Sequence, residues 1–224
     1  MIFVLKSLKL NLGGKIDMPN FIISEHKEAC KTLNEYMSKK ENYYFIHYSC
    51  ENFHDDLPYK KGNRIIAIGV LNAKTQSVQL FSLKNSATIL NVVIDDNTDE
   101  ETLNKIELNL LKNYFSFLSH NRNLKFIHWR MNNDCYGFKC LERRFKSLGG
   151  DDDDLFILDE NNTLNLSLLL TQKYGSNYAR AINNNKGSMY TLFDINNIKK
   201  EGVLSGKEEA EAIYKKIMIK YIFL

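Results

Sequence analysis

The pattern of hydrophobic and polar positions changes from strand-like to helix-like near residue 98. The aromatic run at 43–49 and the apolar run at 64–71 are typical of strands, and residues 77–83 alternate like the return strand of a hairpin. Between residues 98 and 118, apolar residues recur at steps of three and four, which predicts an amphipathic helix. The first half of the chain therefore predicts a hairpin-containing sheet and a helix that covers it.

The second half alternates short apolar runs with amphipathic stretches. Residues 126–128 are predicted to be a strand, and residues 136–148 a helix that ends at Gly149, because glycine readily adopts the left-handed conformation that closes helices. Residues 164–174 and 205–221 are predicted to be further helices. This order indicates an α/β fold with a mixed sheet flanked by helices.

Three predicted helices begin at residues that suit a helix N-terminus. The first covers residues 24–39, with Ser24 as its N-cap. Thr98 and Ser205 are each followed by a glutamate three residues later, which is the signature of a capping box. These residues predict where the three helices start.

Length and composition fit one large domain with a short extension. The 224 residues are 44% hydrophobic, enough for a substantial core, and we divide the chain into an N-terminal extension at 1–42 and a main domain at 43–224. Neither a signal peptide nor a bilayer-spanning stretch is evident, so we expect a cytoplasmic protein without membrane contact. The net charge of +3 is too small to identify a nucleic-acid binder, although a local basic groove would be enough to bind nucleic acid.

The densest polar cluster follows the predicted strand at 126–128. The sequence HWRMNND at 128–134 ends on Asp134 and leads into the next predicted helix. Open α/β folds place their chemistry at the carboxyl edge of the sheet, so this junction is where we expect a functional carboxylate. The chain contains neither G-x-G-x-x-G nor G-x-x-x-x-G-K, so dinucleotide binding and phosphate-loop chemistry are not indicated.

Four segments, taken in order, resemble the DEDD-type 3′–5′ exonucleases, which have a ribonuclease H-like fold. RIIAIG at 64–69 is similar to a strand motif of that family, and HWRMNND is similar to its strand-to-helix motif. KSLGG at 146–150 closes a helix as in the family, and KEEAEA at 207–212 resembles the motif of its last helix. The resemblance implies a ribonuclease H-like mixed sheet and hydrolysis of phosphodiester bonds with two divalent metal ions.

The resemblance also implies which carboxylates hold the metal ions. Glu51, Asp134 and Glu209 stand at or near acidic positions of the family's motifs, and hard ions such as Mg²⁺ or Mn²⁺ prefer carboxylate oxygens. These residues would be both the metal ligands and the catalytic residues. The match is incomplete: Asp134 lies one residue further from His128 than in the family, and Glu209 stands where the family has aspartate. Ser49 stands where the family has its first aspartate, and Leu204 where it has a histidine base.

Each candidate ligand also has a structural interpretation. Glu51 can be a solvated loop residue, and Asp134 can cap the helix that follows it. Glu209 can stabilise the first turn of its helix through the helix dipole. Both interpretations stay open for each residue.

Basic residues gather around the predicted helix that follows Asp134. Arg130, Arg143 and Arg144 are candidates for contacts with phosphate groups, and the expected partner is a single-stranded nucleic acid or a nucleic-acid end. The alternative is that they are ordinary surface arginines.

The leading hypothesis is a nucleic-acid-handling protein that hydrolyses phosphodiester bonds with Mg²⁺ or Mn²⁺. The alternative is a nuclease-fold protein without catalysis, which binds nucleic acid or acts as a protein-interaction or regulatory subunit, for example in bacterial defence. The acidic run at 151–154, the weak net charge and the apolar C-terminal end favour this alternative.

Overall fold

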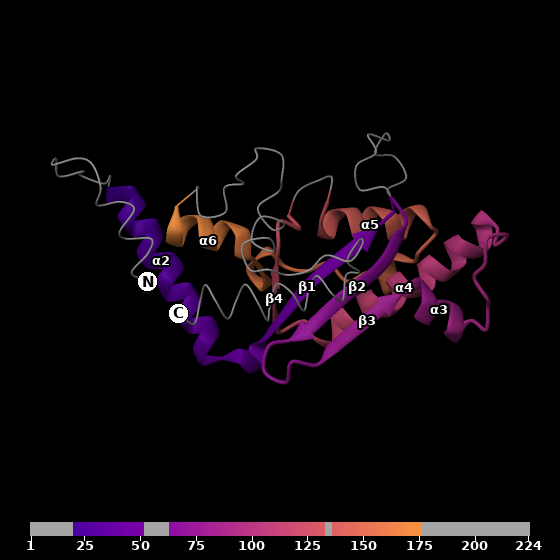
Figure 1. Cartoon of the computed structure of the whole chain (residues 1–224), viewed down its shortest axis with the longest axis horizontal. Helices are drawn as coiled ribbons and strands as arrows, with labels where there is room; N and C mark the ends of the chain where they lie inside the picture. Colours follow the sequence, from indigo (N-terminus) through magenta and orange to yellow (C-terminus); the bar gives the residue numbers. More distant parts are fainter. Residues whose placement is uncertain (1–19, 52–62, 133–135, 176–224) are drawn as a thin grey trace.

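A mixed five-stranded sheet forms the centre of the computed structural model, which describes residues 20–51, 63–132 and 136–175. In spatial order the strands are β3 (Val78–Ser82), β2 (Ile65–Asn72), β1 (Tyr43–Cys50), β4 (Lys125–His128) and β5 (Thr163–Asn165) (Figure 1). The pairs β1–β2 and β2–β3 are antiparallel, and the pairs β1–β4 and β4–β5 are parallel. The predicted α/β class and mixed sheet are therefore confirmed.

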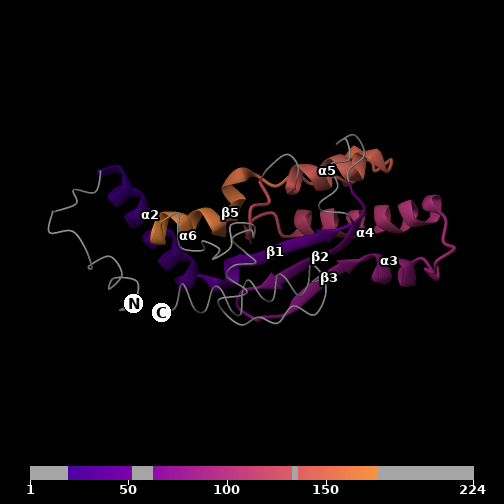
Figure 2. The same ribbon diagram turned by 45° about the horizontal axis from the view of Figure 1, so that its top comes forward.

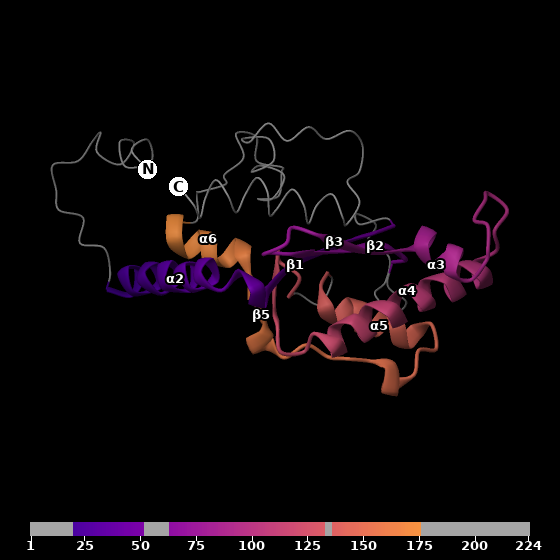
Figure 3. The same ribbon diagram turned by 90° about the horizontal axis from the view of Figure 1, so that it is seen from below.

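The described helices pack against the sheet from two sides. They are α2 (Asn20–Ser38), α3 (Leu83–Ile89), α4 (Glu100–His120), α5 (Phe138–Ser147) and α6 (Leu166–Tyr174), with short 3₁₀ turns at Lys40–Asn42, Asp152–Asp154 and Glu160–Asn162. Helices α4 and α5 lie together on one face (Figure 3), whereas α2 and α6 pack toward the other. None of the described helices is long and apolar enough to cross a membrane.

The central strand β1 contributes to two separate cores because its side chains alternate between the faces. Phe45 packs in the core that contains α2 and α6, whereas Ile46 packs in the core that contains α4 and α5. Both side chains are almost completely buried. The near-continuous apolar sequence of β1 follows from this burial on both faces.

The helix of the predicted N-terminal extension is integrated into the core. Ala29, Leu33 and Tyr36 of α2 are buried in one cluster with Leu166 and Leu170 of α6, and the two helices run side by side (Figure 2). This helix therefore packs with the main domain, mainly through α6, at one end of the sheet.

Two predicted helix starts are wrong. Helix α2 begins at Asn20, so Ser24 lies inside it. Asp99, not Thr98, is the N-cap of α4: its carboxylate accepts from the Thr102 N–H at 2.8 Å. Thr98 instead belongs to the turn before the helix, where its hydroxyl accepts from the Asp95 N–H at 2.8 Å.

Two further differences concern short elements. Residues 83–89 form α3, which the sequence analysis does not predict, and Ser82 caps it by accepting from the Asn85 N–H at 3.2 Å. The helix predicted at 164–174 starts at Leu166, because its first residues complete β5. The helix predicted at 205–221, with Ser205 at its start, lies outside the described residues.

The predicted stop of α5 is confirmed. Gly149 has a left-handed φ of 80°, its N–H bonds to the Lys146 carbonyl at 3.0 Å, and the Gly150 N–H bonds to the Phe145 carbonyl at 3.0 Å. This pair of bonds is the Schellman arrangement that terminates helices.

Candidate active site

The parallel strands β1 and β4 end at the same edge of the sheet. They pair in register, with Phe45 opposite Ile127 and Ile46 opposite His128. Glu51 follows β1 directly, and its N–H bonds to the Arg64 carbonyl at 2.9 Å. Since carboxyl ends of parallel strands are where α/β folds assemble sites, this edge is the candidate site.

The pairing of β1 with β2 is irregular just before Glu51. It shifts between Ser49, which faces Ala67, and Cys50, which faces Ile65. The extra residue of this irregularity, Ile66, belongs to β2, so β1 itself continues without an inserted residue up to Glu51.

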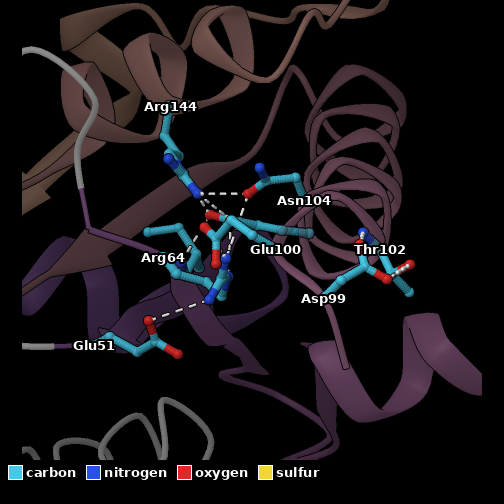
Figure 4. Close-up of polar contacts among 9 residues, drawn as sticks. Glu51, Arg64, Asp99, Glu100, Thr102, Asn104 and Arg144 are labelled. Atoms are coloured by element: carbon cyan, nitrogen blue, oxygen red, sulfur yellow. Dashed lines mark hydrogen bonds and ion pairs between the residues drawn. The ribbon is translucent and has the colours of Figure 1, made fainter. Parts of the chain in front are cut away.

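Glu51 belongs to an ion-pair network centred on Arg64 (Figure 4). The guanidinium of Arg64 lies 3.4 Å from the Glu51 carboxylate and 2.6 Å from the Glu100 carboxylate. Burial lowers the pKa of Arg64, but the hydrogen bond to Glu100 and the neighbouring carboxylate charges outweigh burial and raise it. The side chain of Glu51 is 46% exposed, so this carboxylate faces solvent at the mouth of the network.

The inner part of the network joins α4 to α5. Glu107 is fully buried and accepts from Nε and Nη2 of Arg144 at 2.8 and 2.6 Å. It also accepts from the Ile65 N–H at 2.8 Å. A buried carboxylate needs such partners, because leaving it unpaired would be costly. Glu107 thereby ties both helices to the start of β2.

The segment after β4 turns sharply at Arg130. This residue has a left-handed φ of 54°, its N–H bonds to Oδ1 of Asn165 at 3.2 Å, and its Nε bonds to Ser167 Oγ at 3.1 Å. The Asn165 amide also donates to Oδ1 of Asn132 at 3.2 Å. Polar groups that follow β4 and β5 are therefore joined at this edge.

Tyr136, which follows this segment, packs against the end of β1. Its hydroxyl donates to the Tyr48 carbonyl at 2.9 Å and lies 3.1 Å from Nε2 of the buried His47. The rings of Tyr136 and Tyr48 stack with centroids 4.4 Å apart. The Tyr48 hydroxyl in turn accepts from the Gly137 N–H at 3.0 Å. These contacts fix where α5 begins.

The close approach of the backbone at residue 137 to Met131 requires a glycine. The φ of Gly137 is 150°, and a Cβ there would collide with the backbone carbonyl oxygen of Met131. The N–H of the next residue, Phe138, bonds to that same carbonyl at 3.1 Å. Only glycine permits so close an approach of two backbone segments.

His128 is a core residue of this edge. It is 2% exposed, its Nδ1 accepts from the Met131 N–H at 3.0 Å, and its ring meets Phe138 edge-on. Burial, with a smaller contribution from the charge of His47, lowers the pKa of His128 from 6.5 to about 4. The imidazole is therefore neutral at physiological pH and serves as a hydrogen-bond acceptor.

The structure places some of the predicted site residues and not others. Glu51 is at the carboxyl end of β1, whereas Asp134 and Glu209 lie outside the described residues. Arg130 is exposed at the same edge, and Arg143 is exposed on α5 with Nη2 3.2 Å from Cys140 Sγ. Arg144 is buried, and its guanidinium pairs with the carboxylate of Glu107 inside the fold.

The described residues hold only part of the proposed metal site. Among residues 20–51, 63–132 and 136–175, no three acidic, His or Cys side chains are grouped so that they could hold a metal ion. The half-exposed carboxylate of Glu51 is of the right chemical type for Mg²⁺ or Mn²⁺, and the other two predicted ligands are outside those ranges. Glu51 thus fits the role of one ligand.

Sequence reasoning missed the buried network. Glu107 lies on the apolar stripe of α4, one turn before Leu110 and Leu111. A buried acidic residue in such a stripe needs a polar or charged partner. The position of Glu107 in the sequence therefore indicates a buried ion pair. The identity of that partner, Arg144, depends on how α5 packs.

No family model matches the chain, and neither a curated protein nor a solved structure matches it.

Proposed function

We propose that this chain handles nucleic acid at the carboxyl edge of its sheet and hydrolyses phosphodiester bonds there, like the DEDD-type exonucleases it resembles. The observation that carries the proposal is the parallel pairing of β1 with β4. Glu51 directly follows β1, and Tyr136 holds the segment after β4 against β1. The end of β1, which Glu51 follows, therefore lies against Tyr136 and Gly137, the residues that lead into α5.

The order of elements supports a ribonuclease H-like assignment. In the described residues, β1 and the β2–β3 hairpin precede α4, and α4 is followed by the parallel strand β4 and the helix α5. The resemblance implies this order, from the first acidic strand to the strand-to-helix motif. The topology of the described residues is therefore compatible with the ribonuclease H-like fold that the motifs imply.

The chemistry proposed for the site requires divalent ions. Glu51, Asp134 and Glu209 would hold Mg²⁺ or Mn²⁺, which would activate a water molecule and stabilise the leaving oxygen. Glu51 is suited to this role because its carboxylate is half-exposed at a strand end. Arg64, held by Glu100, positions Glu51 from the protein side.

Two exposed arginines support binding of a nucleic-acid strand. Arg130 lies at the end of β4, and Arg143 lies on α5, the helix that follows the same polar segment. Guanidinium groups suit phosphate oxygens because they can donate two parallel hydrogen bonds. Arg144 is left out of this role because it is buried against Glu107.

A second candidate function is binding without cleavage. Two observations favour it: the carboxylate of Glu51 is already paired with Arg64, and Ser49 provides a neutral hydroxyl where the family has an aspartate. An arginine beside a carboxylate competes with a metal ion for its negative charge. In this form the same edge would bind nucleic acid without hydrolysing it.

Isothermal titration with Mn²⁺ tests the proposal. The full chain should bind Mn²⁺, Asp134→Asn should weaken binding by about tenfold or more, and Ser49→Asp should strengthen it by a similar factor. Asp153→Asn is the control: it removes an exposed carboxylate from the acidic turn and should leave Mn²⁺ binding unchanged. Oligonucleotide binding without Mn²⁺ binding would contradict the proposal and favour the second candidate.

A further inference from the structure

The connection between α3 and α4 exposes an unusual run of apolar side chains. Ile89 and Val93 are 61% and 83% exposed, and Leu90 and Ile94 are each 40% exposed. We call residues 89–94 the apolar loop. It projects at the end of the described fold opposite α2 (Figures 1 and 3). Consecutive exposed apolar residues cost solubility and are retained where they serve binding.

Hydrogen bonds flank the apolar loop at both ends. Asn91 has a left-handed φ of 56°, and the N–H groups of Asn91 and Val92 bond to the carbonyls of Thr88 and Ala87 at 3.2 and 2.9 Å, which is a Schellman arrangement. Asp95 closes the other end by accepting from the Asn97 N–H at 2.9 Å. A surface fixed before binding loses little entropy when a partner docks.

A groove continues from the apolar loop. It has a volume of about 460 Å³ between β3, α3 and α4, and Ile89 is common to groove and loop. Apolar side chains such as Phe81 and Phe117 line it together with uncharged polar side chains such as Asn85 and Asn113 and with His120. No lysine, arginine, aspartate or glutamate lines it. Strand β3 lies at the edge of the sheet among the described strands. The groove therefore offers space with a mixed apolar and polar lining next to a strand edge.

Acidic residues lie at the rim of this surface. The exposed acids Asp95 and Asp96 follow the apolar loop directly, and Lys84 is the only basic residue between 84 and 101. A partner that buries the apolar loop would meet these carboxylates and would gain from opposite charges. In a symmetric dimer that uses this patch on both copies, Asp95 and Asp96 would face their own copies and repel.

We propose that the apolar loop and its groove bind a polypeptide segment of another protein, one with bulky apolar side chains flanked by lysine or arginine. The apolar side chains occupy the groove and cover Ile89 and Val93, and the basic side chains lie against Asp95 and Asp96. This interaction does not depend on the proposed nuclease function.

Selection of short random peptides on the immobilised full chain, followed by fluorescence anisotropy of the enriched peptides, tests the proposal. Enriched peptides should combine bulky apolar residues with lysine or arginine. Ile89→Ser and Val93→Ser should each weaken their binding about tenfold, as for anchor residues of interfaces. Ile157→Ser is the matched control, because Ile157 is also 61% exposed and lies outside this surface. Asp95→Asn with Asp96→Asn should reduce the salt dependence of binding.

Three results would overturn the proposal. The first is that no peptide is enriched, and the second is that the enriched peptides bind Val93→Ser as tightly as the parent chain. The third is a self-associated species in sedimentation velocity that Val93→Ser dissociates, because it would identify a second copy as the occupant. Circular dichroism of the variants should match the parent, since all the substituted side chains are exposed.

Discussion

The hydroxyl of Tyr136 donates a hydrogen bond to the backbone carbonyl oxygen of Tyr48 at 2.9 Å. This contact joins two segments that are 88 residues apart in the chain, at the point where β1 ends and α5 is about to begin. This junction belongs to the candidate active site, because two predicted ligands lie next to it in the sequence: Glu51 follows Tyr48, and Asp134 precedes Tyr136.

Tyr136→Phe should loosen the junction without removing the ring stack on Tyr48. The lost hydroxyl bonds to the Tyr48 carbonyl and approaches His47, so we expect the free energy of unfolding to fall by about 1 kcal/mol. Urea denaturation measures this change. Tyr136→Ala should cost more, because it also removes the stacked ring; equal stabilities of the parent and Tyr136→Phe would contradict the assigned role.

Two buried tyrosines should respond differently to loss of the hydroxyl. The hydroxyl of Tyr48 satisfies the Gly137 N–H, so Tyr48→Phe should destabilise the protein by about 1–3 kcal/mol. The hydroxyl of Tyr114 is buried without a hydrogen-bond partner in the part of the chain that the structure describes. Tyr114→Phe should therefore leave stability unchanged or raise it by about 1 kcal/mol. Thermal melts of both variants check the sign.

Glu107→Gln should be among the most destabilising changes at this edge of the sheet. It removes the charge that holds the buried guanidinium of Arg144, and breaking a buried ion pair costs about 3–5 kcal/mol. Glu101→Gln is the control, because Glu101 pairs with Lys105 on the exposed side of the same helix and should show no measurable change. Urea midpoints that shift equally in both variants would refute the assignment of the network.

The sheet could be predicted more fully than the site. Strands β1 and β2 were predictable because side chains buried on both faces leave a nearly continuous apolar sequence. Helix α3 has only seven residues, too few to show a helical period, and its start depends on Ser82 as a cap. Local sequence thus specifies long elements well and short ones poorly.

The contacts within the site could not be predicted because they join distant segments. Glu107 and Arg144 are 37 residues apart, and Tyr136 and His47 are 89 apart. Sequence spacing identifies Glu51 as an acid at a strand end, but its pairing with Arg64 depends on how β2 folds back beside β1. The packing of α5 against α4 buries Arg144, which the sequence predicts as a candidate for phosphate contacts, beside Glu107.

Stability should decrease with acidity because of His128. Burial lowers its pKa from 6.5 to about 4, so the unfolded chain binds a proton at a pH where the folded chain does not. The stabilisation is complete above about pH 6.5 and is lost progressively as the pH falls toward 4, amounting to about 3 kcal/mol in all. Urea unfolding between pH 7.5 and 4.5 should therefore show a steeper decline for the parent than for His128→Gln. Parallel curves would contradict this account.

We propose above all that this edge of the sheet hydrolyses phosphodiester bonds with the help of divalent ions. The most direct measurement is the shortening of 5′-labelled single-stranded DNA and RNA by the full chain with Mn²⁺, resolved on a sequencing gel. We predict Mn²⁺-dependent shortening from the 3′ end, slowed at least about 100-fold in Asp134→Asn and unchanged in Asp153→Asn. Intact DNA and RNA with the parent chain, or cleavage by Asp134→Asn at the parent rate, would contradict the claim.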